Sequence, residues 1–217
     1  MIINNNLYRR IEKKINYANL KIKPMAFIYL RLLFVLIVFA LSLVASKYGY
    51  IIAPLCSIVF YYLLEYVVLD KNIINRMEKL EKDALEFFPI FLMIFKSVKN
   101  VKNALEKCNE IVDNDLSKEF DLVLADINLG KSLDESLLNM NKKIPSIMVS
   151  NIITDLTESN RLGNSINESI NLQLDLIKEK IRKDYLTDLR IVPFRITIMF
   201  IIFVLLLLGV IVVFGMI

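Results

Sequence analysis

Three long apolar runs interrupt an otherwise charged sequence, at residues 25–45, 50–69 and 196–217. Each has about the twenty residues that an α-helix needs to cross the hydrocarbon core of a bilayer. The only charged side chains within these runs are Arg31, near the start of the first, and Glu65, near the end of the second. We therefore expect three retained transmembrane helices, with Arg31 and Glu65 reaching the headgroups or pairing with each other.

The charged segment between the second and third runs shows helical periodicity in its apolar positions. It predicts a juxtamembrane helix near 71–86, a buried helix over 87–95 that restarts at Pro89, and a series of shorter helices. The shorter helices are expected near 101–111, 116–128, 133–142 and 146–160. A longer final helix has an expected buried stripe formed by Ile166, Ile170, Leu174, Ile177 and Ile181. The predicted fold class is an all-α membrane protein with a cytoplasmic helical bundle.

A short sequence pattern recurs within the predicted bundle. GKSLDESL at Gly130–Leu137 returns as GNSINESI at Gly163–Ile170, and a weaker copy at Val98–Leu105 lacks the glycine. A fixed spacing of this kind is typical of repeated supersecondary units. Glycine permits the left-handed backbone that ends one helix, and a serine two residues later can accept a hydrogen bond from the next helix. The pattern predicts repeated helix–turn–helix units.

The same pattern matches the reciprocal capping box, in which serine and glutamate side chains satisfy each other's backbone amides. The two expected pairs are Ser132 with Glu135 and Ser165 with Glu168. The predicted structural turn and capping residues are therefore Gly130, Ser132, Glu135, Gly163, Ser165 and Glu168.

Charge asymmetry predicts the orientation of the spans. Residues 1–24 carry six basic side chains against one acid, whereas the turn between the first two spans carries only Lys47. Positive charge is retained on the cytoplasmic side, so the arm 1–24 and the domain 70–195 are expected in the cytoplasm of a multi-pass cell membrane protein. The C-terminal span 196–217 then ends outside.

The chain has a net charge of +4. The excess of positive charge lies in the arm 1–24 and is expected to face lipid headgroups. Residues 70–195 contain nineteen basic and twenty-one acidic side chains, which does not favour a nucleic-acid partner. Candidate contacts with the membrane surface or a protein partner are Lys178, Lys180, Arg182, Lys183, Arg190 and Arg195.

The composition excludes several kinds of catalytic site. The chain has no histidine and only two cysteines, which removes nearly all zinc sites and all nucleophile–histidine pairs, so no metal, cofactor or enzymatic activity is expected. Residues Ala125–Ser132, ADINLGKS, loosely fit a nucleotide-binding loop. A phosphate loop needs a preceding strand and several glycines, whereas a helix is predicted here, and Lys131 is expected to be solvated.

The order of these features resembles a known family. The FFP triplet at Phe87–Pro89 is followed by the degenerate repeat, the two glycine repeats and a proline-marked final span. Over about Glu81–Ile217 this order resembles the type II secretion system F domain, and most closely the tight-adherence (Tad) pilus platform proteins TadB and TadC. The chain departs from that pattern at Val98, where glycine is usual, and in having one span after the domain where two are common.

The resemblance implies a non-catalytic inner-membrane platform of a pilus or type II secretion machine. Such proteins engage a hexameric motor ATPase and pilin-like subunits, and they work as homodimers or with a paralogous partner. A transporter subunit or a membrane-anchored sensor with a helical domain is the alternative. A membrane-anchored ATPase is a third possibility, which depends on Ala125–Ser132 binding nucleotide.

Overall fold

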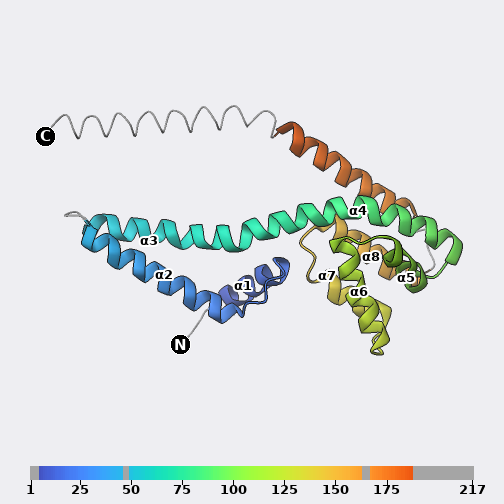
Figure 1. Ribbon diagram of the computed structural model, residues 1–217, viewed down its shortest axis with the longest axis horizontal. Coiled ribbons are helices and arrows are strands. Elements are labelled where there is room, and N and C mark those ends of the chain that lie inside the picture. The colour runs from blue at the N-terminus through green and yellow to red at the C-terminus, as the bar shows by residue number, and fades with distance from the viewer. Residues whose placement is uncertain (1–4, 46–48, 163–166, 188–217) are drawn as a thin grey trace. The chain divides into compact units, whose positions relative to one another are not determined.

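The computed structural model describes residues 5–45, 49–162 and 167–187, and every regular element among them is a helix (Figure 1). This confirms the predicted all-α class. The elements in chain order are α1 (Asn5–Tyr17), α2 (Pro24–Ala45), α3 (Gly49–Glu65), the π-helical turn η1 (Tyr66–Asp70), α4 (Lys71–Val98), α5 (Val101–Ile111), α6 (Asp115–Asn128), α7 (Leu133–Asn141) and α8 (Ile147–Leu162). Residues 167–187 form a further helix.

The chain divides into two compact units, Met1–Leu174 and Asp175–Ile217. The division falls within the helix 167–187, and therefore inside the segment 70–195 that the sequence predicts as one domain. Of the predicted buried stripe, Ile170, Leu174 and Ile177 are buried and Ile181 is half-buried, whereas Ile166 lies outside the described residues.

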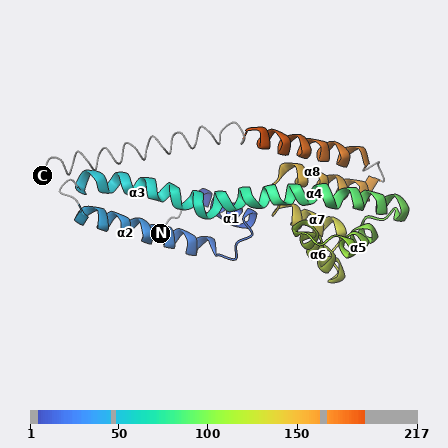
Figure 2. The ribbon, with the colours of Figure 1, turned by 45° about the horizontal axis from the view of Figure 1, so that its top comes forward.

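Helices α2 and α3 lie side by side as an antiparallel hairpin (Figures 1 and 2). They correspond to the first two predicted spans. No helix in the described part of the chain reaches the length and apolarity that a bilayer-spanning segment requires. The predicted third span, at residues 196–217, lies outside the described residues.

Helices α3, η1 and α4 follow one another without a break. The residues at both junctions, Glu65, Asp70 and Lys71, have right-handed helical backbone angles. The predicted restart at Pro89 is wrong, because Pro89 lies inside α4. Proline removes one backbone hydrogen bond, but Phe88 and Phe91 on either side are fully buried and their packing requires the helix to continue.

Aromatic packing along α4 forms the centre of the bundle. The rings of Phe87 and Phe120 stack with centroids 4.9 Å apart, and Phe88 meets both rings edge to face. Helix α4 contacts α5, α6 and α8, while α7 packs against α6 and α8. Fully buried partners from these helices include Leu105, Cys108, Leu116, Leu137, Ile152, Ile153 and Leu156. The four short helices therefore share a core that α4 organises.

The repeat segments build equivalent helix starts. After α6, Gly130 has a φ of 94°, and the Oγ of Ser132 accepts a hydrogen bond from the backbone amide of Glu135 at 3.2 Å. After α4, Lys99 has a φ of 52°, and the Oδ1 of Asn100 accepts from the amide of Asn103 at 3.0 Å. Asn100 and Ser132 occupy the same position of the repeat. The glycine-free copy therefore keeps the N-cap and moves the left-handed residue by one position.

Of the two predicted reciprocal capping boxes, that of Ser165 with Glu168 falls partly outside the described residues, and that of Ser132 with Glu135 is incomplete. In the described residues Glu135 does not return a side-chain bond to Ser132, so the motif at α7 is half formed. A complete box begins α6, where Asn114 Oδ1 accepts from the Ser117 amide at 2.9 Å and the Ser117 Oγ accepts from the Asn114 amide at 3.0 Å. Serine in place of the usual glutamate or glutamine hides this box from a sequence search.

The left-handed residues of the two described repeat copies, Lys99 and Gly130, predict substitutions of opposite effect. Because a left-handed backbone costs a side-chain-bearing residue about 1 kcal/mol, Lys99→Gly should raise the free energy of unfolding by about that amount. Gly130→Ala should lower it similarly, since no atom near the new methyl group compensates for the backbone strain. Thermal unfolding of the full-length protein in mild detergent, followed by circular dichroism, measures both. A change in the free energy of unfolding in the same direction for both variants would contradict this account.

The buried thiol predicts a pH dependence. Cys108 has no exposed surface, its thiol donates to the Phe87 carbonyl at 3.6 Å, and burial raises its pKa to about 12. An unfolded thiol ionises near 9.0, so the stability that the protonated thiol supplies should be present below that pH and be lost as pH rises toward 12. Alkylation of Cys108 at about pH 8 should require denaturant, and mass spectrometry of the peptide that contains Cys108 measures the extent of labelling. Rapid labelling of the native protein would contradict the burial, and Cys108→Ala provides the control for the pH effect.

Candidate functional site

A cluster of charged side chains lies where α1, α2 and the end of α3 meet, and we call Lys14, Arg31, Glu65 and Asp70 the charged junction. Glu65, the last residue of α3, accepts from Arg31 Nη1 at 2.8 Å and from Lys14 Nζ at 2.6 Å. Arg10 lies farther from the same carboxylate, at 3.7 Å. The predicted pairing of Arg31 with Glu65 is confirmed, and Glu65 also binds the N-terminal arm.

Lys14 bridges two carboxylates at this point. Its Nζ lies 2.6 Å from Glu65 Oε1 and 2.6 Å from Asp70 Oδ1. Burial acts to lower the pKa of Lys14, but the hydrogen bonds and charges of Asp70 and Glu65 outweigh it, so its pKa is raised. Lys14 therefore remains protonated at physiological pH and holds α1 against the long helix.

The π-helical turn explains how one lysine reaches both acids. Glu65 and Asp70 are five residues apart, a separation that directs side chains to different sides of an α-helix. A π-helix places residues i and i+5 above one another through its i to i+5 hydrogen bonds, and the Lys71 amide donates to the Tyr66 carbonyl in this register. The turn η1 therefore brings the two carboxylates together.

Arg31 is held by three separate contacts. Besides Glu65, its Nε donates to the Tyr61 carbonyl at 3.0 Å, and its guanidinium lies 3.4 Å from the centroid of the Tyr61 ring. Only 3% of its surface is exposed. A buried arginine needs partners for its charge and its donors, and Glu65 and Tyr61 supply them for the charge, Nε and Nη1.

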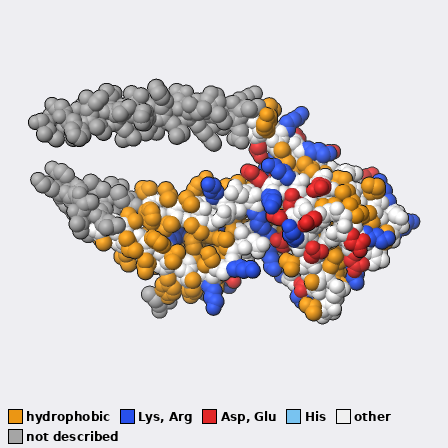
Figure 3. Space-filling view, viewed as in Figure 1, with side chains coloured by type: hydrophobic (Ala, Val, Ile, Leu, Met, Phe, Trp, Pro, Cys, Tyr) orange, Lys and Arg blue, Asp and Glu red, His pale blue; other side chains and the backbone are white. Residues whose placement is uncertain are grey.

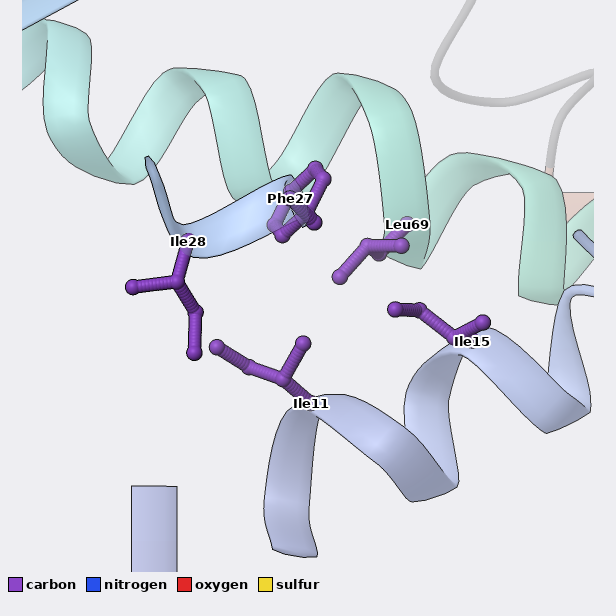
Figure 4. Close-up of a cluster of buried hydrophobic side chains, with 5 residues drawn as sticks. All are labelled: Ile11, Ile15, Phe27, Ile28 and Leu69. Atoms are coloured by element: carbon purple, nitrogen blue, oxygen red, sulfur yellow. The ribbon is translucent and has the colours of Figure 1, made fainter. Parts of the chain in front are cut away.

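An apolar layer supports the charged junction (Figure 4). It consists of Ile11 and Ile15 from α1, Phe27 and Ile28 from α2, and Leu69 from η1, all of them buried. Ile15 and Leu69 immediately follow and precede charged junction residues in the chain. The layer therefore fixes the distance between the elements that carry the charges.

A second polar contact joins α4 to three other segments. Arg76 Nη1 donates to the carbonyls of Tyr17 and Lys143, each at 2.8 Å, and its Nη2 donates to Glu119 Oε1 at 2.6 Å. These acceptors belong to the end of α1, the loop before α8, and α6. In the sequence Arg76 contributes only to the charge asymmetry, and nothing in its pattern indicates this role.

Two acids of α4 hold the starts of α6 and α8. Asp83 Oδ2 accepts from the amides of Asp115 and Leu116 at 3.0 and 3.3 Å, and burial raises the pKa of Asp83 despite these bonds. Glu81 accepts from the Ser146 hydroxyl at 2.8 Å. A carboxylate at a helix N-terminus satisfies free amides and the helix dipole, so α4 positions these helices through polar contacts as well as its core.

The predicted site residues that the structure describes belong to several different elements. Lys131 pairs with Asp126 at 2.8 Å at the end of helix α6, and a helix rather than a strand leads into it. Glu168 is exposed in the helix 167–187, where Lys180 and Arg182 also lie. Lys178 pairs with Asp175 and Lys183 with Glu179. Gly163, Ser165, Arg190 and Arg195 lie outside the described residues. Within the residues that are described, no group of three potential metal ligands occurs.

Comparison with known protein families identifies a match over the second part of the chain. The family model for the type II secretion system (T2SS), protein F, matches residues 87–214, more than half of the chain. The chain belongs to the type II secretion system protein F family. Searches of curated proteins and of solved structures found no match.

The matched region starts in the second half of α4, at the aromatic core, and includes the turn at Gly130 and the sequence repeat that begins at Gly163. The charged junction and Arg76 precede the region that matches protein F. Their geometry is therefore a property of this chain that membership of the protein F family does not itself describe.

The contacts of Arg76 predict a strong effect on stability. Arg76 and Glu119 are largely buried, and removal of one partner leaves the other charge unsatisfied, so Arg76→Ala should lower the free energy of unfolding by about 2 kcal/mol. The exposed ion pair between Lys79, on the same helix as Arg76, and Asp115 of α6 provides the control. Lys79→Ala should leave the unfolding midpoint unchanged. Combining Arg76→Ala with Glu119→Gln should cost less than the sum of the single changes. Additive costs would contradict a direct interaction.

Proposed function

We propose that this protein F family member is a non-catalytic membrane platform that couples a cytoplasmic motor ATPase to the assembly or export of pilin-like subunits. The observation that carries the proposal is the unbroken helical path from α3 through η1 to α4. This path connects the apolar hairpin directly to the core of the protein F domain. A displacement of the bundle would therefore move the hairpin, because no flexible linker lies between them.

The surface of the hairpin supports a location in the bilayer. Large apolar side chains of α2 and α3 are exposed, including Leu36 and Tyr62 at 66% each, and Figure 3 shows hydrophobic side chains gathered over this part of the molecule. Large apolar side chains exposed together on one surface are typical of a region that contacts lipid or another protein. We place the hairpin in the cell membrane on this basis, with the C-terminal segment 196–217 as a third span.

The distribution of charge supports a cytoplasmic position for the arm and the bundle. Exposed basic residues Arg9, Lys13, Lys21 and Lys23 lie on either side of the turn that leads into α2. Basic side chains at this position favour the anionic headgroups of the cytoplasmic leaflet. The orientation proposed is an arm and bundle in the cytoplasm and a C-terminus outside.

The charged junction and Arg76 give the platform its stiffness in this proposal. Glu65 and Asp70 tie α1 to the long helix, and Arg76 ties the end of α1 to α6 and the loop before α8. The proposed partners are a hexameric secretion ATPase on the bundle, pilin-like subunits along the spans, and a second copy or a paralogous platform protein. Within the family we propose the tight-adherence pilus subtype, on the order of FFP and the repeats in the sequence.

Photo-crosslinking from two defined positions tests this function. A photo-reactive residue replacing Leu129, which is 81% exposed beside the Gly130 turn, should capture a secretion-type ATPase in native membranes. The same residue replacing Leu36 on α2 should capture pilin-like subunits or a second platform chain. Mass spectrometry of the products identifies the partners, and each position serves as the control for the other. Capture of solute-binding proteins or of none of these subunits would contradict the proposal.

A further inference from the structure

An apolar cavity of about 230 Å³ opens beside the charged junction, between the start of α2 and the end of α3. Its lining is formed by Ile22, Ala26, Phe27, Leu30, Arg31 and Leu64, together with Val68 of η1. An apolar cavity of about 150 Å³ is large enough to hold a small hydrocarbon and stays free of water. The cavity beside α2 is therefore suited to part of an aliphatic chain.

One polar group in the cavity wall lacks a partner. The guanidinium of Arg31 uses Nε and Nη1 for Tyr61 and Glu65, but its Nη2 is sealed from solvent and makes no hydrogen bond to any described residue. A buried charged donor left without an acceptor is costly. The unsatisfied group requires an oxygen acceptor, and an anionic one satisfies it best.

The surrounding charges also favour an anion. Three cations, Arg10, Lys14 and Arg31, meet only two carboxylates, Glu65 and Asp70. The carboxylates already bind Lys14 and Arg31, so one positive charge is left over in the cluster. A ligand with a negative headgroup and an aliphatic chain would balance the additional positive charge and give Nη2 an acceptor. Its aliphatic chain would cover the apolar wall of the cavity.

We propose that this cavity is a binding site for one anionic phospholipid. Entry of the lipid turns the Arg31 guanidinium toward the cavity, so that a phosphate oxygen accepts from Nη2. An acyl chain lies over Ala26 and Leu64 and continues along the exposed side of α2. Ile22 and Leu30 form the rim of the cavity and are themselves partly exposed, at 41% and 56%, so a lipid enters from the side. The bound phosphate offsets the additional positive charge of Arg10 beside the junction and stabilises the contact of α1 with η1. This inference rests on the membrane location proposed above.

Native mass spectrometry of the full-length protein in detergent tests the site. Titration with phosphatidylglycerol should give one tightly bound lipid, and phosphatidylcholine should bind at least about tenfold more weakly, because its headgroup has no net charge. Arg31→Lys removes Nη2 but keeps a cation beside Glu65, and it should weaken phosphatidylglycerol binding by about tenfold or more. Ala26→Phe fills the cavity without touching the ion pairs and should weaken binding to the same extent.

Ala40→Phe is the matched control, since Ala40 is an exposed position on the same helix outside the cavity. It should bind phosphatidylglycerol as the unaltered protein does. Equal binding of the two lipids, or full binding by a folded Ala26→Phe variant, would overturn the proposal. Stabilisation by inorganic phosphate alone, equal to that by phosphatidylglycerol, would overturn the lipid assignment in favour of a free anion. Recovery of the protein in the soluble fraction of cells would instead refute the membrane location, so the two failures are distinguishable.

Discussion

The placement of the Glu65 carboxylate is the constraint on which the packing of α1 and α2 against α3 depends. An acid at the end of an apolar helix is stable there only if it is paired, and Arg31 of α2 and Lys14 of α1 supply the two charges. Because Glu65 ends α3, these pairs fix α1 and α2 to the helix that becomes α4. The π-turn adds Asp70 to the same lysine, so a local change in helical register gives Lys14 a second carboxylate partner.

The bundle depends on the same helix through different physics. Along α4, the buried aromatic residues Phe87, Phe88 and Phe91 attract the short helices without specifying their orientation, because hydrophobic burial is not directional. Asp83 and Glu81 supply the direction, because Asp83 binds the first residues of α6 and Glu81 binds Ser146, the residue before α8. The bundle is therefore oriented by a small number of charged and polar bonds at its margins.

Most of the helices could be predicted from the sequence, whereas most of the polar site could not. Helical periodicity and the repeat located α5 to α8 to within a few residues, because those signals are local. The exception is Pro89, where tertiary packing overrides a local breaker. The pairing of Arg31 with Glu65 was predictable because two charges in apolar runs have few alternatives. Lys14 is one of several basic residues in the arm, and Arg76 one of many surface charges, so their partners depend on distant segments that no local pattern reveals.

The repeat illustrates which part of a turn carries the structural information. Its two described copies differ in the residue that takes the left-handed backbone, glycine in one and Lys99 in the other. Both keep an oxygen-bearing side chain, Ser132 or Asn100, at the position that accepts the first amide of the next helix. A left-handed lysine is strained by about 1 kcal/mol, an amount that one capping bond offsets. The cap therefore defines where each helix begins, and the glycine determines how easily the preceding turn is made.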